Sequence, residues 1–350
     1  MADLVNVQAD DVRVGIVGCG DTARWRARAL QAAGFRITAA ASRPGSQRLG
    51  PFAREFGVPR AFRGWREMLA ESDGWDCLAI CTWPDGTPEV LAAAADLGKP
   101  ILVEKPVAWS SAALADLCRQ AHRRILVGYN RRFYPAVQEA RRLARRGPPL
   151  LAHLSLPKDV LAPEGPDPRR DYLRGFFESV SALGIDVARF VLGDLRLESV
   201  QRLHNAGGNL YGLAALLTTE RGDVLQLTGN LNAAANFALT LYWPGRRFEL
   251  LPFEIGSEYE GMEVVPPTPE YPIRRYVPRL VRTISLSGCD LVEKPGFVAE
   301  VEAFRELVRG GRPSDAAATL EDALAATRLC EELTGVRFAP GDSFPNPWAS

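Results

Sequence analysis

The sequence predicts an α/β fold with two domains: a doubly wound parallel sheet over residues 1–129 and an α/β domain with a mostly antiparallel sheet over residues 130–350. Three observations support this prediction. A chain of 350 residues corresponds to about two domains of ordinary length. Short apolar runs alternate with helix-forming runs through the first domain, which is typical of parallel sheets. Several alternating apolar runs later follow one another without helices between them, which is typical of antiparallel sheets.

The elements of the first domain follow from these runs. Strands are expected at residues 12–17, 36–41, 77–82, 101–104 and 125–129, and helices from 23 to 30, up to about 56, at 88–97 and at 111–122. Right-handed crossovers between such strands would bring all their carboxyl ends to one edge of the sheet. In the second domain, strands are expected at 150–156, 198–203, 210–219, 224–231, 237–242 and 247–251, and helices at 179–192, 297–309 and 320–334.

The turn after the first strand fits the dinucleotide-binding pattern G-x-G-x-x-G/A. Gly18 would allow the sharp turn, Gly20 would let a pyrophosphate approach the backbone, and Ala23 would let the helix pack close to its strand. The free N–H groups of this helix, which begins around Asp21 and Thr22, would hold the phosphates. A glycine turn can also be purely structural, but the strand–helix units that follow favour a binding site.

Polar residues follow the other strands of this sheet. Ligands of such sheets bind beyond the carboxyl ends of the strands, so we expect one crevice there. The residues at these ends are, in chain order, Ser42 and Arg43, Thr82 and Trp83, Glu104 and Lys105, and Tyr129 and Asn130.

The end of the second strand indicates which coenzyme would bind. A site selective for NAD usually has Asp or Glu there to bind the ribose hydroxyls. Ser42 and Arg43 stand there instead, and a hydroxyl with a guanidinium would hold a 2′-phosphate by charge-assisted hydrogen bonds. The sequence therefore predicts NADP(H), with NAD(H) as the second choice. In the alternative interpretation Arg43 is one of many solvent-facing arginines.

Composition limits the other functions. Lys+Arg and Asp+Glu balance at 42 each, so we expect a small-molecule substrate and no nucleic-acid partner. No apolar run is long enough to span a bilayer, which argues against a membrane partner. The six cysteines have no paired metal spacing, which predicts no metal site and reduced thiols in a cytoplasmic protein. None of His122, His153 and His204 has a second ligand at metal spacing, although His153 could approach the crevice.

Three stretches, residues 15–20, 98–106 and 128–133, resemble the glucose–fructose oxidoreductase and inositol dehydrogenase family (Gfo/Idh/MocA). The similarity runs over nearly the whole chain, because residues 296–311 and 319–335 also resemble the closing helices of the family. The resemblance implies an N-terminal Rossmann domain and a C-terminal domain whose open sheet covers the substrate and often mediates oligomerisation, here into a homodimer or homotetramer. It implies hydride transfer between a nicotinamide and a carbon of a sugar, cyclitol or related alcohol.

The resemblance also implies that Lys105, in Glu-Lys-Pro, points at the reacting oxygen. A desolvated ammonium beside a nicotinamide can protonate or polarise a carbonyl as hydride arrives. In the alternative interpretation Lys105 pairs with a neighbouring carboxylate. A second Val-Glu-Lys-Pro at residues 292–295 precedes a helix, so Lys294 is expected to be solvated and structural.

The family's second signature, Asp-x-Gly-x-His-x-x-Asp, is incomplete here. Asp186 fits its last position, as a helper in catalysis or an anchor for its helix, whereas Leu183 replaces the histidine and Ser179 the first aspartate. Four alternatives remain open. Lys105 could do the proton work alone or with a hydroxyl such as that of Tyr129, Tyr134 or Tyr172, or the substrate could be an imine or conjugated system. Catalysis could also be lost, or the net chemistry could be non-redox with a bound nicotinamide.

We predict an NADP(H)-dependent oxidoreductase that acts on a small polar carbonyl or alcohol, with a sugar derivative as the favoured substrate. Arg131 and Arg132 could bind a substrate anion, although each could instead form a salt bridge. The other residues expected to face the substrate are Tyr134, Asp171, Tyr172 and Leu183.

Overall fold

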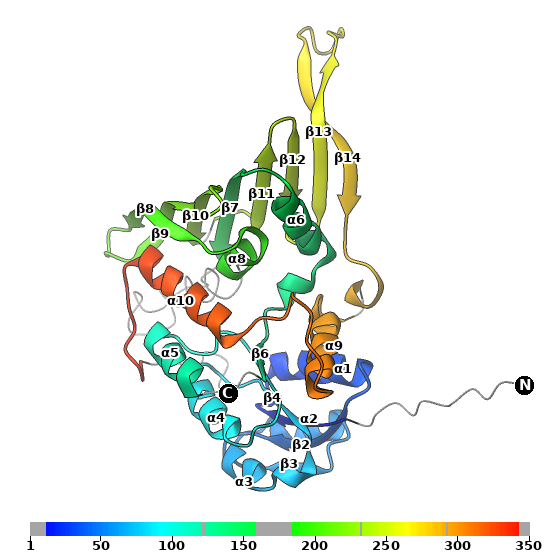
Figure 1. The fold of residues 1–350 in the computed structure, drawn as a ribbon, viewed down its shortest axis with the longest axis vertical. Coiled ribbons are helices and arrows are strands. Elements are labelled where there is room, and N and C mark those ends of the chain that lie inside the picture. Colours follow the sequence, from blue (N-terminus) through cyan, green and yellow to red (C-terminus); the bar gives the residue numbers. More distant parts are fainter. Residues whose placement is uncertain (1–11, 121–123, 159–183, 232, 292, 343–350) are drawn as a thin grey trace, which may run out of the picture.

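The computed structural model describes residues 12–120, 124–158, 184–231, 233–291 and 293–342 (Figure 1). Asp171, Tyr172, Ser179, Leu183 and His122 lie outside these residues. Within the described ranges, no helix has both the length and the apolar character needed to cross a membrane.

The first sheet confirms the predicted parallel, doubly wound architecture. Its strand order is β3-β2-β1-β4-β5-β6, and every neighbouring pair is parallel. The strands are β1 Arg13–Val17, β2 Arg36–Ala41, β3 Arg60–Phe62, β4 Cys77–Ile80, β5 Ile101–Val103 and β6 Ile125–Val127. The helices are α1 Asp21–Ala32, α2 Leu49–Glu55, α3 Trp65–Ala70, α4 Thr87–Ala95 and α5 Ser111–Gln120, with a 3₁₀ turn, η1, at Ser72–Gly74.

The strand order reverses direction between β1 and β4. From β1 the chain adds β2 and β3 on one side, and then crosses to the other side to add β4, β5 and β6. A crevice forms at such a switch point, outside the carboxyl ends of the two central strands. The turns that follow β1 and β4 therefore border the crevice.

The second sheet has eight strands in the order β14-β13-β12-β11-β7-β10-β9-β8. Only the β7–β10 pair is parallel among the pairs described, so the prediction of a mostly antiparallel sheet is confirmed. The strands are β7 Leu151–Lys158, β8 Arg196–His204, β9 Leu210–Thr218, β10 Val224–Leu231, β11 Ala238–Trp243, β12 Arg246–Leu250, β13 Gly256–Val265 and β14 Arg275–Ile284.

Two helices lie against one face of this sheet: α6 Pro135–Arg146, and α8 Asp186–Leu192 (Figure 1). The helix α6 and the strands β13 and β14 were not predicted. Short 3₁₀ turns, η2 Asn130–Phe133 and η4 Gly288–Leu291, lie where the chain enters and leaves the domain. The apolar side chains of α6 and α8, such as Val137 and Val191, share a core with the inner face of the sheet.

The last two helices, α9 Phe297–Val308 and α10 Leu320–Thr334, return to the first domain. Phe297, Val301 and Phe304 of α9 are buried in one core with Val14 and Ile16 of β1. Helix α10 packs against α5, and residue 318 just before it bridges to β6. The predicted domain boundary at 129/130 stays a prediction, and both helices that pack back on the first domain come from beyond it.

The hairpin of β13 and β14 extends beyond the rest of the second sheet as an arm (Figure 1). Most side chains of β14 are exposed, and so are the outer ones of β13. The exposed residues include large apolar ones: Met262, Val264, Tyr271, Ile273, Tyr276, Leu280 and Val281.

Candidate active site

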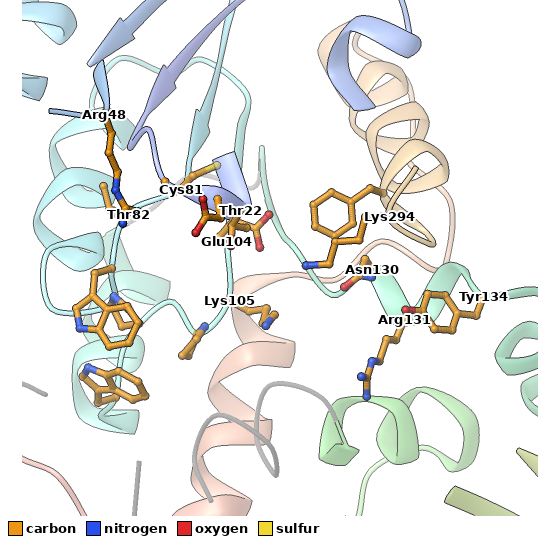
Figure 2. Close-up of a pocket in the computed structure, with 17 residues that line it drawn as sticks. Thr22, Arg48, Cys81, Thr82, Glu104, Lys105, Asn130, Arg131, Tyr134 and Lys294 are labelled. Carbon is orange, nitrogen blue, oxygen red and sulfur yellow. The ribbon is translucent and has the colours of Figure 1, made fainter. Parts of the chain in front are cut away.

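Two adjoining cavities, of 470 and 560 Å³, lie at the carboxyl ends of the first sheet and form one cleft. Both are lined by the glycine turn after β1 and by the turn after β4. The residues lining both cavities are Gly20, Arg48, Cys81, Thr82 and Trp83. The smaller cavity reaches Lys105 and the second domain (Figure 2), and the larger one reaches the end of β2.

The two glycines of the first turn have different roles. Gly18 has a φ of +97°, and a Cβ there would lie 2.4 Å from the carbonyl oxygen of Cys81, so a side chain has no room. A Cβ on Gly20 would meet only Nη1 of Arg48, at 3.5 Å, so Gly20 leaves open space beside the backbone. Helix α1 begins after Gly20 without a side-chain cap. Its first N–H groups are therefore available to a phosphate in the cleft, and the residues fit a dinucleotide.

Asp21 and Thr22, in the first turn of α1, line the smaller cavity, and Ala23 is fully buried against the sheet. A helix with alanine at this point can approach its strand closely, as expected from the motif.

The larger cavity is lined at its far end by Ser42 and Arg43, as the sequence predicts. Ser46 and Arg48 from the next turn line it as well and were not identified from the sequence. The sequence did contain a signal for these two residues, because a second arginine follows Arg43 by five positions in a loop with glycine and serine. The residues after β2 therefore contribute two guanidiniums and two hydroxyls to the described lining of the larger cavity.

An aromatic pair forms the wall of the smaller cavity on the β4 side. The rings of Trp83 and Trp109 are 5.8 Å apart at an angle of 63°, and Nε1 of Trp109 donates a 2.7 Å hydrogen bond to Oδ1 of Asp85. The hydroxyls of Thr82 and Thr87 lie 2.7 Å apart, and Thr87 also donates to the carbonyl of Trp83, which fixes this turn. This wall therefore presents the two indole rings to the cavity beside the hydroxyl of Thr82.

Glu104 and Lys105 follow β5 into the same cavity. Glu104 is 6% exposed, and Arg26 of α1 donates to its Oε1 from Nε at 3.0 Å and from Nη2 at 2.6 Å. Its charge is thus engaged by a buried arginine. Lys105 is half-buried and lies between the β4 side of the cleft and the residues from the second domain (Figure 2). An ammonium in this position can reach an oxygen of a ligand in the cavity.

Arg26 also lies beside a second buried carboxyl. Its Nη2 is 2.6 Å from Oε2 of Glu300 on α9, yet neither carboxyl oxygen of Glu300 accepts an aligned hydrogen bond among the described residues. Burial raises the pKa of Glu300 to about 7, although the Arg26 charge opposes the shift. The ring of Phe297 covers the Arg26 guanidinium, at 4.2 Å.

The structure corrects the expectation that Lys294 is solvated. Lys294 is half-buried, lines the smaller cavity, and points across it toward Glu104 (Figure 2). Burial lowers its pKa, while the charge of Glu104 opposes that shift. The residues after it are fixed by contacts distant in sequence. Asn130 Nδ2 donates to the carbonyl of Pro295 at 2.8 Å, and the Gly296 N–H donates to Asp290 Oδ1 at 2.8 Å.

Gly296 explains how closely this segment approaches the first domain. Its φ is +74°, and a Cβ would lie 2.2 Å from the carbonyl oxygen of Asn130. Local pattern reading could not find this contact, because it joins residues 166 positions apart.

Tyr129 and Asp186 do not line the cleft. Tyr129 is 5% exposed within the core of the first domain, and burial raises its pKa far above the usual range. Asp186 is 2% exposed and accepts hydrogen bonds from Arg132 Nε at 2.9 and 3.0 Å. Arg132 also donates to Asp322, at 3.1 Å. Asp186 thus anchors α8 to the domain junction, the second of the two roles that the sequence left open.

Burial raises the pKa of Asp186, and the Arg132 charge opposes the shift. The same pairing holds the pKa of Arg132 above its ordinary value despite burial, so Arg132 stays charged and paired. Of the two candidate anion-binding arginines, Arg132 forms the salt bridge that the sequence allowed.

Arg131, Asn130 and Tyr134 line the smaller cavity from the side of the second domain (Figure 2). Burial raises the pKa of Tyr134 to about 12, so its hydroxyl is protonated near neutrality. His153 lies on the exposed side of β7, with Nε2 3.4 Å from the Thr228 hydroxyl, and does not reach the cleft. His204 ends β8 and is exposed too.

Comparison with known proteins is consistent with this geometry. Residues 12–129 match the family model described as "Oxidoreductase family, NAD-binding Rossmann fold", which is the Gfo/Idh/MocA model. The chain is 23% identical over 192 residues to the myo-inositol 2-dehydrogenase of Thermotoga maritima, covering 52% of this chain and 55% of that protein. It is 30% identical over 172 residues to "D-xylose 1-dehydrogenase (NADP(+)) 2" of Haloferax volcanii, covering 47% and 52%. The chain thus spans about half the length of the curated relatives it matches.

A solved structure extends the likeness of fold to both domains. Levoglucosan dehydrogenase in complex with NADH and L-sorbose superposes with a TM-score of 0.73 and 16% identity, covering 93% of this chain and 96% of that one. At this identity the likeness supports the fold alone.

Proposed function

We propose that this chain, whose residues 12–129 match the Gfo/Idh/MocA family model of NAD-binding oxidoreductases, transfers a hydride to or from a small polar carbonyl or alcohol. The single observation that carries the proposal is that the uncapped N-terminus of α1 and the ammonium of Lys105 open into the same 470 Å³ cavity. A sugar derivative is the favoured substrate. Its support is that the relatives above are named as myo-inositol and D-xylose dehydrogenases.

In the proposed reaction the nicotinamide, when bound, supplies or accepts the hydride. Lys105 protonates the substrate oxygen during reduction and takes the proton back during oxidation, as a general acid and base. Trp83 and Trp109 limit the access of water from one side. This proposal assigns proton transfer to Lys105, since Tyr129 and Asp186 are buried outside the cleft.

We propose NADP(H) as the coenzyme because Ser42, Arg43 and Arg48, which follow β2, line the larger cavity. A 2′-phosphate between two guanidiniums would form charge-assisted hydrogen bonds that the hydroxyl of NAD(H) cannot match. Asp85 and Glu89 also line this cavity, but they follow β4 rather than β2, the strand whose end contacts the adenosine ribose in such folds.

The test is a fluorescence titration of the purified protein with NADPH and with NADH. Wild type should bind NADPH about tenfold or more tightly than NADH, and Arg43→Asp should reverse or remove the difference. Arg312→Asp, a change on a 91% exposed side chain outside the cleft, is the matched control and should have no effect. Failure of both coenzymes to bind would exclude the oxidoreductase, and equal affinities in wild type would exclude only the NADP(H) preference.

We also propose a homodimer or homotetramer in the cytoplasm. The support for the oligomer is the arm of β13 and β14, whose apolar side chains are exposed in the single chain. Large exposed apolar patches usually mark interaction surfaces. The location is a prediction from the spacing of the cysteines.

A further inference from the structure

We propose that Arg131 and Lys294 form an anion-binding subsite, so that the substrate is a sugar derivative that carries a carboxylate or a phosphate group. This inference rests on the proposed function, since it names the substrate class for the same cleft. Both residues line the cavity that contains Lys105. Arg131 belongs to η2 and Lys294 lies between η4 and α9, and both enter the cavity from the same side (Figure 2).

Arg131 is held in place by two aromatic rings, and no ion pair engages it in the part of the chain that the structure describes. Its guanidinium carbon lies 4.7 Å from the ring centre of Phe237 and 5.3 Å from that of Phe253. Its Nη1 is buried without a hydrogen-bond partner, and no carboxylate lies within ion-pair distance among the described residues. A buried donor without an acceptor is unfavourable, and an anionic ligand in the cavity would supply the acceptor.

Lys294 adds a second cation to the same side of the cleft. Its Nζ lies 4.8 Å from the ring centre of Phe297, and no ion pair engages it within the described part of the chain. Burial is the main cause that lowers the pKa of Lys294, and the charges of Arg26 and Arg131 add to the shift, so Arg131 is close enough to repel Lys294. Glu104, the nearest opposing charge, already accepts two hydrogen bonds from Arg26. An anion between the two cations would relieve their repulsion.

The other cationic side chains around the cavity do not belong to the proposed subsite. Arg48 lines both cavities and lies on the coenzyme side, and Arg132 is paired with Asp186 and Asp322. Lys105 lies between the coenzyme side and the proposed subsite (Figure 2). A substrate anchored by its anionic end at Arg131 and Lys294 would therefore extend its polyol part toward Lys105. An uncharged polyol would supply no anionic partner to either cation.

The experiment is calorimetric titration of the NADPH-saturated protein with pairs of ligands that share a six-carbon chain but differ in charge. The pairs are sorbitol with gluconate, and glucose with glucose 6-phosphate. At least one charged ligand should bind about tenfold or more tightly than its uncharged partner. The gluconate and phosphate arms distinguish a sugar acid from a sugar phosphate. Equal affinities within both pairs, or no measurable binding of either charged ligand, would overturn the subsite.

Variants then assign the effect to the two residues. Lys294→Met and Arg131→Gln should each weaken binding of the charged ligand about tenfold or more, and leave sorbitol, glucose and NADPH affinities unchanged. Arg312→Gln, on the 91% exposed side chain, is the control and should change nothing. A loss of NADPH affinity in both cleft variants would mean that these cations hold the coenzyme instead. If NADPH does not bind to wild type, the proposed function fails, and the same titrations of the coenzyme-free protein still test the subsite.

Discussion

Replacing Glu300 with glutamine should change how the stability of the protein depends on pH. The carboxyl has an ordinary pKa of 4.5, and burial raises it to about 7 in the folded protein. The folded state therefore binds this proton more tightly than the unfolded state does. Stability from this group is fully present below pH 4.5 and is lost as pH rises toward 7. At 1.36 kcal/mol per pKa unit, the loss amounts to about 3 kcal/mol when the carboxyl is fully ionised.

Glutamine has the shape of the protonated side chain and cannot ionise, so Glu300→Gln should escape this loss. The free energy of unfolding, measured by urea denaturation at several pH values from 5 to 9, should fall less steeply for the variant. The gap between the two curves should widen by roughly 2 to 3 kcal/mol over that range. Glu306→Gln, an exposed position on the same helix, is the control and should follow wild type. Parallel curves for Glu300→Gln and wild type would show that the carboxyl does not carry a raised pKa.

Three further changes test other parts of the molecule. Lys105→Met should lower kcat by about 10²- to 10⁴-fold, while the coenzyme affinity stays the same, and unchanged turnover would exclude the proton-transfer role. Asp186→Asn leaves the buried Arg132 without its main counter-charge and should lower the free energy of unfolding by about 3 to 5 kcal/mol in urea denaturation, with little change in coenzyme binding. A stability equal to wild type would refute the anchoring role. Leu280→Asp places a charge on the exposed arm and should lower the mass measured by light scattering to that of one chain of 38.3 kDa. An unchanged assembly would show that this part of the arm is not in the interface.

The strands β4 and β5 beside the cleft could be predicted from the sequence because both are fully buried and short. Cys77–Ile80 and Ile101–Val103 are apolar at every position, and a polar residue follows each within two positions. The same reasoning placed the glycine turn at the edge of the sheet, where φ of Gly18 excludes other residues. These features depend on local sequence and on the rules of parallel sheets.

The helix α6 was missed although its signal was present. Its buried residues Ala136, Val137, Ala140, Leu143 and Ala144 have helical spacing, between arginines that hid the apolar pattern. The strands of the arm give no such signal, because most of their side chains are exposed on both faces and alternation is absent.

Lys294 could not have been assigned to the cleft from its neighbours. Its position depends on the hydrogen bond from Asn130 to Pro295 and on the close approach of Gly296 to the Asn130 backbone. Each half of that contact looks like an ordinary loop in the sequence. Contacts between segments so far apart are set by the whole fold.

Because α9 packs on the first domain, truncating the chain at one position cannot yield a complete first domain. A fragment that ends after β6 would lack Phe297, Val301 and Phe304, which pack in one core with residues of α1 and β1. The apolar side chains that they cover would then be exposed to solvent. A swap of the Rossmann portion between relatives must therefore carry two discontinuous fragments, with the second sheet inserted between them. The two fragments would be joined near Asn130 and Pro295, beside residues that line the cavity. Such a chimaera would therefore change the lining of the cavity as well as the connection between the domains.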